Sequence, residues 1–185
     1  MNETKQKEIF IVLTQSGTWM ARLLRKITHT EYNHSSISFD EGLASMYSFG
    51  RRYKYYPFWG GLVQETPTTG VFGRFPNTKA LVLGIGVSEA KYEALKQYVA
   101  EMYKRHKKYH YNYIGCFFAW FNRGWTRKKH FYCSEFVKDL FIKFELAAES
   151  LFPRATRPYD LKKIFSRDEI FRGKLLDYVR DATKN

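Results

Sequence analysis

The 185-residue chain lacks several features that would assign its class at once. It has only two cysteines, Cys116 and Cys133, which is too few for a disulfide framework. No apolar run approaches the length of a membrane span, and the first eight residues lack the apolar core of a signal peptide. We therefore expect a cytoplasmic protein whose thiols stay reduced. The length suits a single domain, residues 1–185, and no internal repeat divides it.

Acidic residues are also scarce. The chain has 18 Asp and Glu against 31 Lys and Arg, a net charge of +13. This charge favours anionic partners, and an anionic surface or lipid is one candidate. Residues 51–61 interleave cations with aromatic rings, as single-stranded nucleic-acid platforms do, but they carry no RNA-module signature. We therefore do not expect nucleic acid as the partner, and we interpret these residues as a loop at the rim of a cleft.

Metal ligands at useful spacing are missing as well. His106 and His110 lie close together in the sequence, but no cysteine or carboxylate stands beside them at ligand spacing. We expect neither a metal nor a cofactor. Aromatic residues, in contrast, are abundant, with 16 Phe, 14 Tyr and 4 Trp. Residues 109–125 are rich in them and predict core packing or part of a cleft wall, with Cys116 as a structural thiol.

Residues 130–137, with the sequence HFYCSEFV, contain the candidate nucleophile. Apolar residues recur at helical spacing from Cys133 onward, and Ser134 and Glu135 suit the first turn of a helix. Cys133 therefore lies at, or one residue before, a helix N-terminus, whose positive end lowers the pKa of a thiol and favours the thiolate. The alternative is a buried structural cysteine, because free cysteine is among the most buried residue types.

A predicted β-hairpin provides the candidate base. Two loosely alternating stretches, residues 32–39 and 43–50, flank a turn that contains Gly42. His34 stands at the start of the first strand. A lone histidine is more often a core or surface residue, but a histidine at a strand end and a cysteine at a helix start form the arrangement that a thiol–imidazole pair needs.

This order of elements resembles the permuted papain-like cysteine hydrolases, the YiiX-like branch of the NlpC-type superfamily, which is related to the lecithin:retinol acyltransferase group. In ordinary papain-like enzymes the Cys helix comes first, whereas in this branch the His hairpin precedes it, as here. The resemblance covers residues 8–161. It is carried by NHSSISF at 33–39, MYSFGR at 46–51 and YCSEFV at 132–137, and RPYDL at 157–161 is similar to a Pro-x-Asp-Leu segment of the branch.

The resemblance implies a fold and an activity. The fold is α+β and circularly permuted papain-like, with a mostly antiparallel sheet on which the Cys133 helix packs. The strands that cluster near the hairpin, and helices that do not alternate regularly with strands, argue independently against a parallel sheet. The implied activity is hydrolysis of a small peptide or amide by Cys133 and His34 through a thioester. Two alternatives remain: lipid acyl hydrolysis or transfer, and a non-catalytic basic module that binds an anionic ligand or nucleic acid.

A third polar group should hold the imidazole in one tautomer. In the family it often comes from the strand beside the histidine strand, but here that strand has no His, Asp or Glu after the turn. Folding the hairpin about Glu41 places Ser48 roughly across from His34. Glu65, a carboxylate in an apolar stretch after Gly60 and Gly61, is the better candidate, and we expect those glycines to turn the chain back toward the sheet.

The oxyanion of a tetrahedral intermediate also needs donors. The Cys133 backbone N–H is the first candidate, and Gln15 is a second, with a simple turn residue as its alternative interpretation. The remaining expected strands are residues 9–13, 62–65, 71–75, 80–87 and 169–179. The remaining expected helices are residues 18–27, 88–107 and 160–165, and residues 181–185 form a frayed tail.

Overall fold

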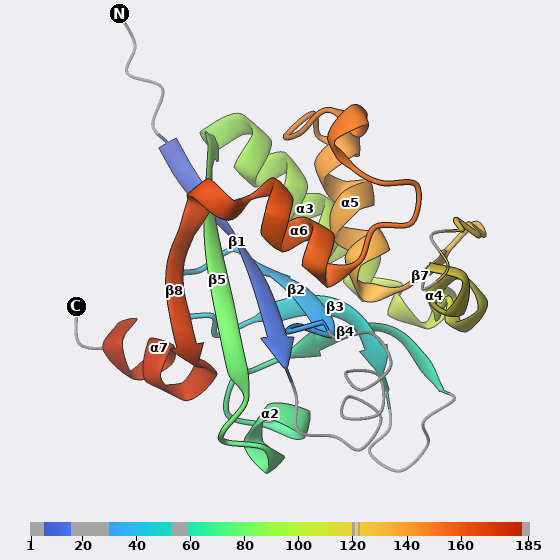
Figure 1. The fold of residues 1–185 in the computed structure, drawn as a ribbon. Helices are drawn as coiled ribbons and strands as arrows, with labels where there is room; N and C mark the ends of the chain where they lie inside the picture. The colour runs from blue at the N-terminus through green and yellow to red at the C-terminus, as the bar shows by residue number, and fades with distance from the viewer. Residues whose placement is uncertain (1–5, 16–29, 53–58, 120, 122, 183–185) are drawn as a thin grey trace, which may run out of the picture.

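One mixed sheet organises the part of the chain that the computed structural model describes, which is residues 6–15, 30–52, 59–119, 121 and 123–182 (Figure 1). The strands are β1 (Gln6–Gln15), β2 (His34–Ser38), β3 (Met46–Arg51), β4 (Gly60–Glu65), β5 (Lys79–Ser88), β6 (His110–Tyr111), β7 (His130–Phe131) and β8 (Glu169–Lys174). Their order is β7-β6-β4-β3-β2-β1-β5-β8, and only the β6–β7 pair is parallel. The expected α+β class with a mostly antiparallel sheet is confirmed.

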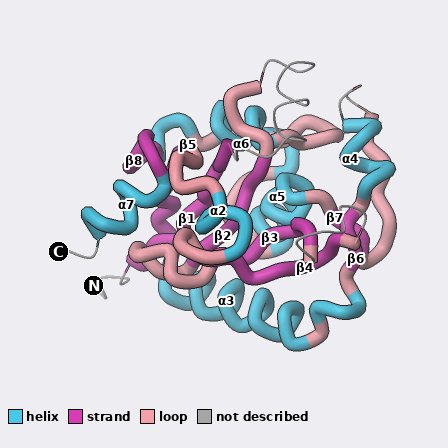
Figure 2. Tube along the Cα trace, turned by 90° about the horizontal axis from the view of Figure 1, so that it is seen from below, coloured by secondary structure: helices cyan, strands magenta, loops and turns pink. Residues whose placement is uncertain are grey.

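The helices lie on both faces of this sheet. The α-helices are α2 (Gly70–Arg74), α3 (Glu89–Lys104), α4 (Tyr113–Ala119), α5 (Cys133–Lys143), α6 (Pro158–Ile164) and α7 (Leu175–Ala182). Three 3-10 turns are η1 (His106–Lys108), η2 (Glu149–Leu151) and η3 (Ser166–Asp168). Figure 2 shows β6, β7 and α4 at one end of the sheet and β8 and α7 at the other. None of the helices described here is long and apolar enough to cross a membrane.

Strand β1 explains the two cores. Because side chains alternate across a strand, Ile9, Ile11 and Leu13 enter one apolar cluster while Phe10 and Val12 enter another. The larger cluster joins β1 to α3 and α5, and the smaller one joins it to α2 and α7. A central strand buried on both faces accounts for the unbroken apolar run at residues 9–13.

The helix starts agree closely with the sequence. The Ser88 hydroxyl caps α3 by accepting a hydrogen bond from the Lys91 backbone N–H. The apolar stripe of α3 is buried, and its members are Tyr92, Leu95, Val99 and Met102. Helix α5 begins at Cys133, as its amphipathic spacing predicts. Helix α6 starts at Pro158, slightly before the predicted turn.

Three predictions about local structure are wrong. Residues 70–74 form one helical turn rather than a strand, which allows Phe72 to fill the smaller core. Residues 169–179 are two elements, because β8 ends at Lys174 and the helical spacing of Leu175 and Tyr178 then buries both side chains. Gly60 and Gly61 lie within β4 and make no turn. A Cβ atom on Gly61 would stand 2.3 Å from the Tyr109 carbonyl oxygen, so this strand needs a glycine there.

Three expectations fall wholly or partly on residues outside the described ranges. The predicted helix at 18–27 is one of them. Another is the rim loop at 51–61, of which residues 53–58 are not described. Residues 183–185 of the predicted tail are likewise not described, and α7 continues to Ala182.

Candidate active site

His34 is the first residue of β2 and is held from several sides. In the register between β1 and β2 it pairs with Thr14. Its ring centroid lies 6.5 Å from that of Phe72 on α2. The His34 side chain is 19% exposed, so the ring is largely removed from water. A strand position with packing on the ring fixes the orientation of the imidazole, which a catalytic base requires.

Glu65, the last residue of β4, contacts this imidazole directly. Glu65 Oε2 lies 3.0 Å from His34 Nε2, and the Glu65 side chain is 17% exposed. A carboxylate only accepts hydrogen bonds, so Nε2 carries the proton and Nδ1 is left for another partner. The geometric part of the Glu65 prediction is therefore confirmed, while its catalytic role stays a prediction.

Two serines complete the surroundings of the carboxylate. The hydroxyls of Ser48 and Ser36 donate to Glu65 Oε2 at 2.7 and 2.9 Å, and Ser36 Oγ also lies 3.4 Å from His34 Nε2. The same oxygen therefore receives three polar contacts. These serines are completely buried, so they hold the carboxylate in place with little competition from water.

The position expected for Ser48 is corrected. Strands β2 and β3 pair Ile37 with Tyr47 and Ser38 with Met46. Extending this register places Ser48 opposite Ser36, two residues away from His34. Ser48 therefore acts on His34 through Glu65 rather than directly. The hairpin loop is longer than a fold about Glu41 assumes, because the paired residues leave residues 39–45 outside the ladder.

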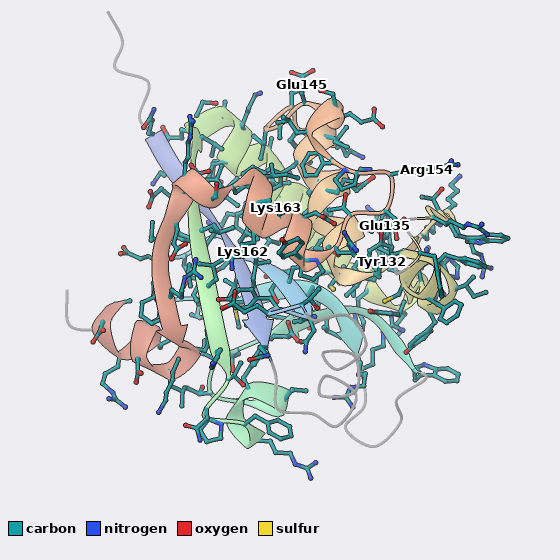
Figure 3. All side chains as sticks on the ribbon, viewed as in Figure 1. Tyr132, Glu135, Glu145, Arg154, Lys162 and Lys163 are labelled. Atoms are coloured by element: carbon teal, nitrogen blue, oxygen red, sulfur yellow. The ribbon has the colours of Figure 1, made fainter. Side chains whose placement is uncertain are left out.

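Cys133 is the first residue of α5, and it is buried with 5% of its surface exposed. The Glu135 carboxylate accepts a hydrogen bond from the backbone N–H of Tyr132, which fixes the helix start. The Ser134 hydroxyl donates to the Thr156 carbonyl at 2.9 Å and so ties α5 to the segment that leads into α6. Figure 3 labels Tyr132 and Glu135 at this end of α5.

Charges around His34 favour the imidazolium. Burial would lower the pKa of His34, but the Glu65 carboxylate and the hydrogen bond with Cys133 outweigh burial and raise this pKa well above its ordinary value. Burial would likewise raise the pKa of Glu65, and the charge of His34 with the hydrogen bonds from His34, Ser48 and Ser36 lowers it instead. The pair therefore carries opposite charges at neutral pH.

The same charges act on the thiol. Burial would raise the pKa of Cys133, but a hydrogen bond with His34, the charge of its imidazolium and the Ser35 backbone N–H lower it. Cys116 shows the opposite behaviour, since burial and the nearby negative charge of Cys133 raise its pKa to about 12. The two thiols of the chain therefore differ in kind: Cys133 is suited to attack carbon, and Cys116 remains protonated.

The two expected oxyanion donors, the Cys133 backbone N–H and Gln15, lie on different elements. The backbone N–H of Cys133 belongs to the first turn of α5, whose N–H groups have no partner within the helix. Gln15 is the partly buried last residue of β1. It follows Thr14, the residue that pairs with His34, and so lies close to His34 along the β1–β2 pair.

The sequence interpretation missed two residues of the site. Ser36 lies two residues after His34, so strand alternation alone puts both side chains on one face and could have identified it. The backbone N–H of Ser35 contributes to the lowered pKa of Cys133, a role that no side-chain pattern reveals. Among the described residues, no group of three or more His, Cys, Asp or Glu side chains is placed to hold a metal ion.

The site has to be interpreted from its own geometry. Comparison of the chain with family models, with curated proteins and with solved structures found no significant match. The arrangement is a thiol at a helix start, an imidazole at a strand start and a carboxylate on the second strand beyond it. A thiol, an imidazole and a carboxylate are the kinds of group that serve as nucleophile, base and orienting group in covalent acyl transfer.

Proposed function

We propose that the protein is a cysteine hydrolase that cleaves a peptide or amide bond through a thioester on Cys133. The observation that carries this proposal is the His34–Glu65 contact, beside which the charge of His34 lowers the pKa of Cys133. A carboxylate holds the imidazolium, the imidazolium lowers the pKa of the thiol, and the helix start adds N–H groups beside the sulfur.

In the first half of the reaction, His34 holds the proton of the Cys133 thiol. The thiolate attacks the carbonyl carbon of the substrate and forms a C–S bond, and the backbone N–H of Cys133 stabilises the oxyanion. The intermediate collapses when the C–N bond breaks. His34 gives its proton to the departing nitrogen, so the amine leaves neutral and a thioester remains.

In the second half, His34 acts as a base. It removes a proton from water, which attacks the thioester carbonyl, and the C–S bond then breaks. The released acid and the restored thiolate–imidazolium pair close the cycle. Glu65 keeps the ring in one tautomer throughout, because its oxygen accepts from Nε2, and Nδ1 is left to exchange the proton in the reaction.

The permuted papain-like family is part of the proposal. Its support is topological: the histidine strand β2 precedes the cysteine helix α5, and α5 packs against an antiparallel sheet. The RPYDL segment forms the start of α6, where Asp160 accepts a hydrogen bond from the Arg157 backbone N–H at 2.8 Å. The segment therefore helps to hold α5 through the Ser134–Thr156 hydrogen bond next to it.

An acyl substrate from a lipid is the second candidate. The observation that favours it is an exposed set of large apolar side chains, including Phe117, Phe121 and Trp125, in a strongly basic chain. The same thiolate would attack an ester carbonyl and expel an alkoxide, which His34 protonates. The two candidates share the acyl-enzyme and differ in the leaving group and the acceptor.

Trapping the acyl-enzyme tests the proposal. When the protein is mixed with an activated acyl ester and quenched in acid, we expect one acyl group on Cys133 and none on Cys116, because only the first thiol is reactive. Mass spectrometry of the digested protein locates the group, and treatment with hydroxylamine should remove it as it removes thioesters. Acylation that is equal on both cysteines, or absent, would contradict the proposal.

A further inference from the structure

A large apolar surface lies outside the proposed catalytic residues, around α4. Its side chains are between 39% and 64% exposed, and they are Trp59, Tyr113, Ile114, Phe117, Phe121 and Trp125. Five of them belong to residues 109–125, which were expected to pack in the core or line a cleft wall, and their exposure excludes the core for these five side chains. Large side chains exposed together on a folded protein mark an interaction site.

The members of this α4 surface form a continuous patch. The rings of Phe117 and Phe121 lie 5.5 Å apart, Phe117 and Phe118 lie 5.8 Å apart, and Phe118 stacks on Trp125 at 5.7 Å. Trp59, the residue just before β4, joins the patch because it shares a hollow of about 390 Å³ with Tyr113 and Ile114. Figures 1 and 2 both show α4 projecting at the β7 end of the molecule.

The rim of the α4 surface is positively charged. No aspartate or glutamate occurs in the sequence between Glu101 and Glu135. Arg127 lines the same hollow as Trp59, and Arg51 is close enough to Tyr113 to oppose the rise of its pKa that burial causes. Arg123, Lys128, Lys129 and Arg154 are also exposed, and the last three line a neighbouring hollow that shares Arg127 with this one. Figure 3 labels Arg154 beside α4, and its side chain packs on Gly124.

This combination fits a lipid bilayer better than a nucleic acid. Aromatic and aliphatic side chains with a cationic rim are typical of surfaces that lie in the interface of an anionic membrane. A single-stranded nucleic acid needs open ring faces on which bases stack. Here Phe117 meets its neighbours edge to face, and Phe118 and Trp125 cover each other. Ile114 offers no ring at all.

We infer that the α4 surface docks the protein on a membrane that contains anionic phospholipid. The apolar side chains enter the boundary between headgroups and acyl chains, and Arg127, Lys128 and Lys129 contact the anionic headgroups. The inference does not require catalysis, because docking uses none of Cys133, His34 and Glu65. Docking and hydrolysis can therefore fail separately.

Co-sedimentation with vesicles tests this inference. The full chain with Cys133→Ala is used, so that no lipid is hydrolysed. We expect it to sediment with vesicles of phosphatidylcholine and phosphatidylglycerol, more weakly with phosphatidylcholine alone, and less as salt is raised. In the same background, Phe117→Ser with Phe121→Ser should lower the affinity at least about tenfold, because both rings lose their burial in lipid.

Matched variants separate the apolar and the charged contributions. Lys128→Gln with Lys129→Gln should weaken binding about tenfold on the anionic vesicles and little on phosphatidylcholine alone. Ile170→Ser on β8, 48% exposed at the other end of the sheet, should change nothing. Lys79→Gln with Lys174→Gln, which removes the same charge from the β5–β8 pair, should also leave binding unchanged.

Four results would overturn the inference. One is the absence of vesicle binding at low salt, and another is binding that Phe117→Ser with Phe121→Ser leaves intact. The third is a dimer, seen by sedimentation velocity, that these two substitutions dissociate while vesicles remain unbound, which would assign the surface to a second copy of the chain. A single-stranded oligonucleotide that binds through the same residues in place of vesicles would assign it to nucleic acid.

Discussion

Cys133→Ser and His34→Ala should each reduce hydrolysis by at least about a thousandfold while the protein stays folded. A serine hydroxyl at position 133 has a far higher pKa than the thiol, so the buried imidazole cannot keep it ionised. An alanine at position 34 removes both the base and the charge that lowers the pKa of Cys133. Turnover of a model amide and of a model ester gives the rates, and circular dichroism checks the fold.

The double variant distinguishes a catalytic pair from two unrelated losses. Because the thiol and the imidazole act as one unit, Cys133→Ser combined with His34→Ala should be little worse than either single change. Cys116→Ser is the matched control: the Cys116 thiol has a pKa of about 12 and no placed role in the chemistry, so this variant should keep its activity. Activity that survives in Cys133→Ser would contradict the mechanism.

Glu65→Gln should lower the maximal rate by an order of magnitude or more with the fold retained, since groups that orient a catalytic histidine have effects of at least this size. The amide keeps the shape of the side chain but loses the charge that stabilises the imidazolium. Ser48→Ala removes only one of the hydroxyl donors to Glu65 and should have a smaller effect. Glu101→Gln, an exposed and ion-paired carboxylate on α3, is the matched control and should change nothing.

The pH profile gives Glu65→Gln a signature that a structural defect does not share. In the native protein the rate should rise as Cys133 ionises below the usual pKa of a thiol, and it should fall only above the raised pKa of His34. Without the carboxylate, burial lowers the pKa of His34, so the falling limb moves to lower pH. Because less of His34 is then in the imidazolium form, the pKa of Cys133 rises, and the rising limb of the profile moves to higher pH. An unchanged profile would place Glu65 outside the mechanism.

Local signals predicted the helix starts and the central strand. At Cys133, the amphipathic spacing and an acidic residue in the first turn agree, and the helix begins there. At Ser88 a capping hydroxyl precedes a long apolar stripe. Residues 9–13 form a continuous apolar run because β1 is buried on both faces. In each case one local rule and the tertiary environment favour the same structure.

Features that depend on residues distant in the sequence could not be predicted from local patterns. The pairing of Ser48 with Ser36 depends on the register of a hairpin whose loop length no turn signal fixes. The placement of Gly61 in a strand depends on the Tyr109 carbonyl and on Arg52, whose guanidinium donates to that carbonyl at 2.6 Å. One-turn helices such as α2 are too short for periodicity to distinguish them from strands.

The residues of the candidate site also differ in whether a local sequence signal marks them. Cys133 and His34 were found because helix starts and strand ends are marked in the sequence. Glu65 was found by elimination, since acidic residues are few and the neighbouring strand has none. Ser36 was missed although alternation pointed to it, and the Ser35 backbone N–H carries no side-chain signal. The aromatic side chains of α4 were expected in the core or in a cleft wall, and composition alone does not decide which of them are exposed.

The central claim is that Cys133 is an activated thiol, and its rate of alkylation tests this most directly. With a small electrophile such as iodoacetamide at neutral pH, Cys133 should be labelled at least about a hundredfold faster than Cys116. Accessibility alone predicts the reverse, because Cys133 is the more buried of the two. In His34→Ala, the labelling rate of Cys133 should fall to about that of Cys116. Equal and slow labelling of both cysteines in the native protein would contradict the account and favour a non-catalytic module.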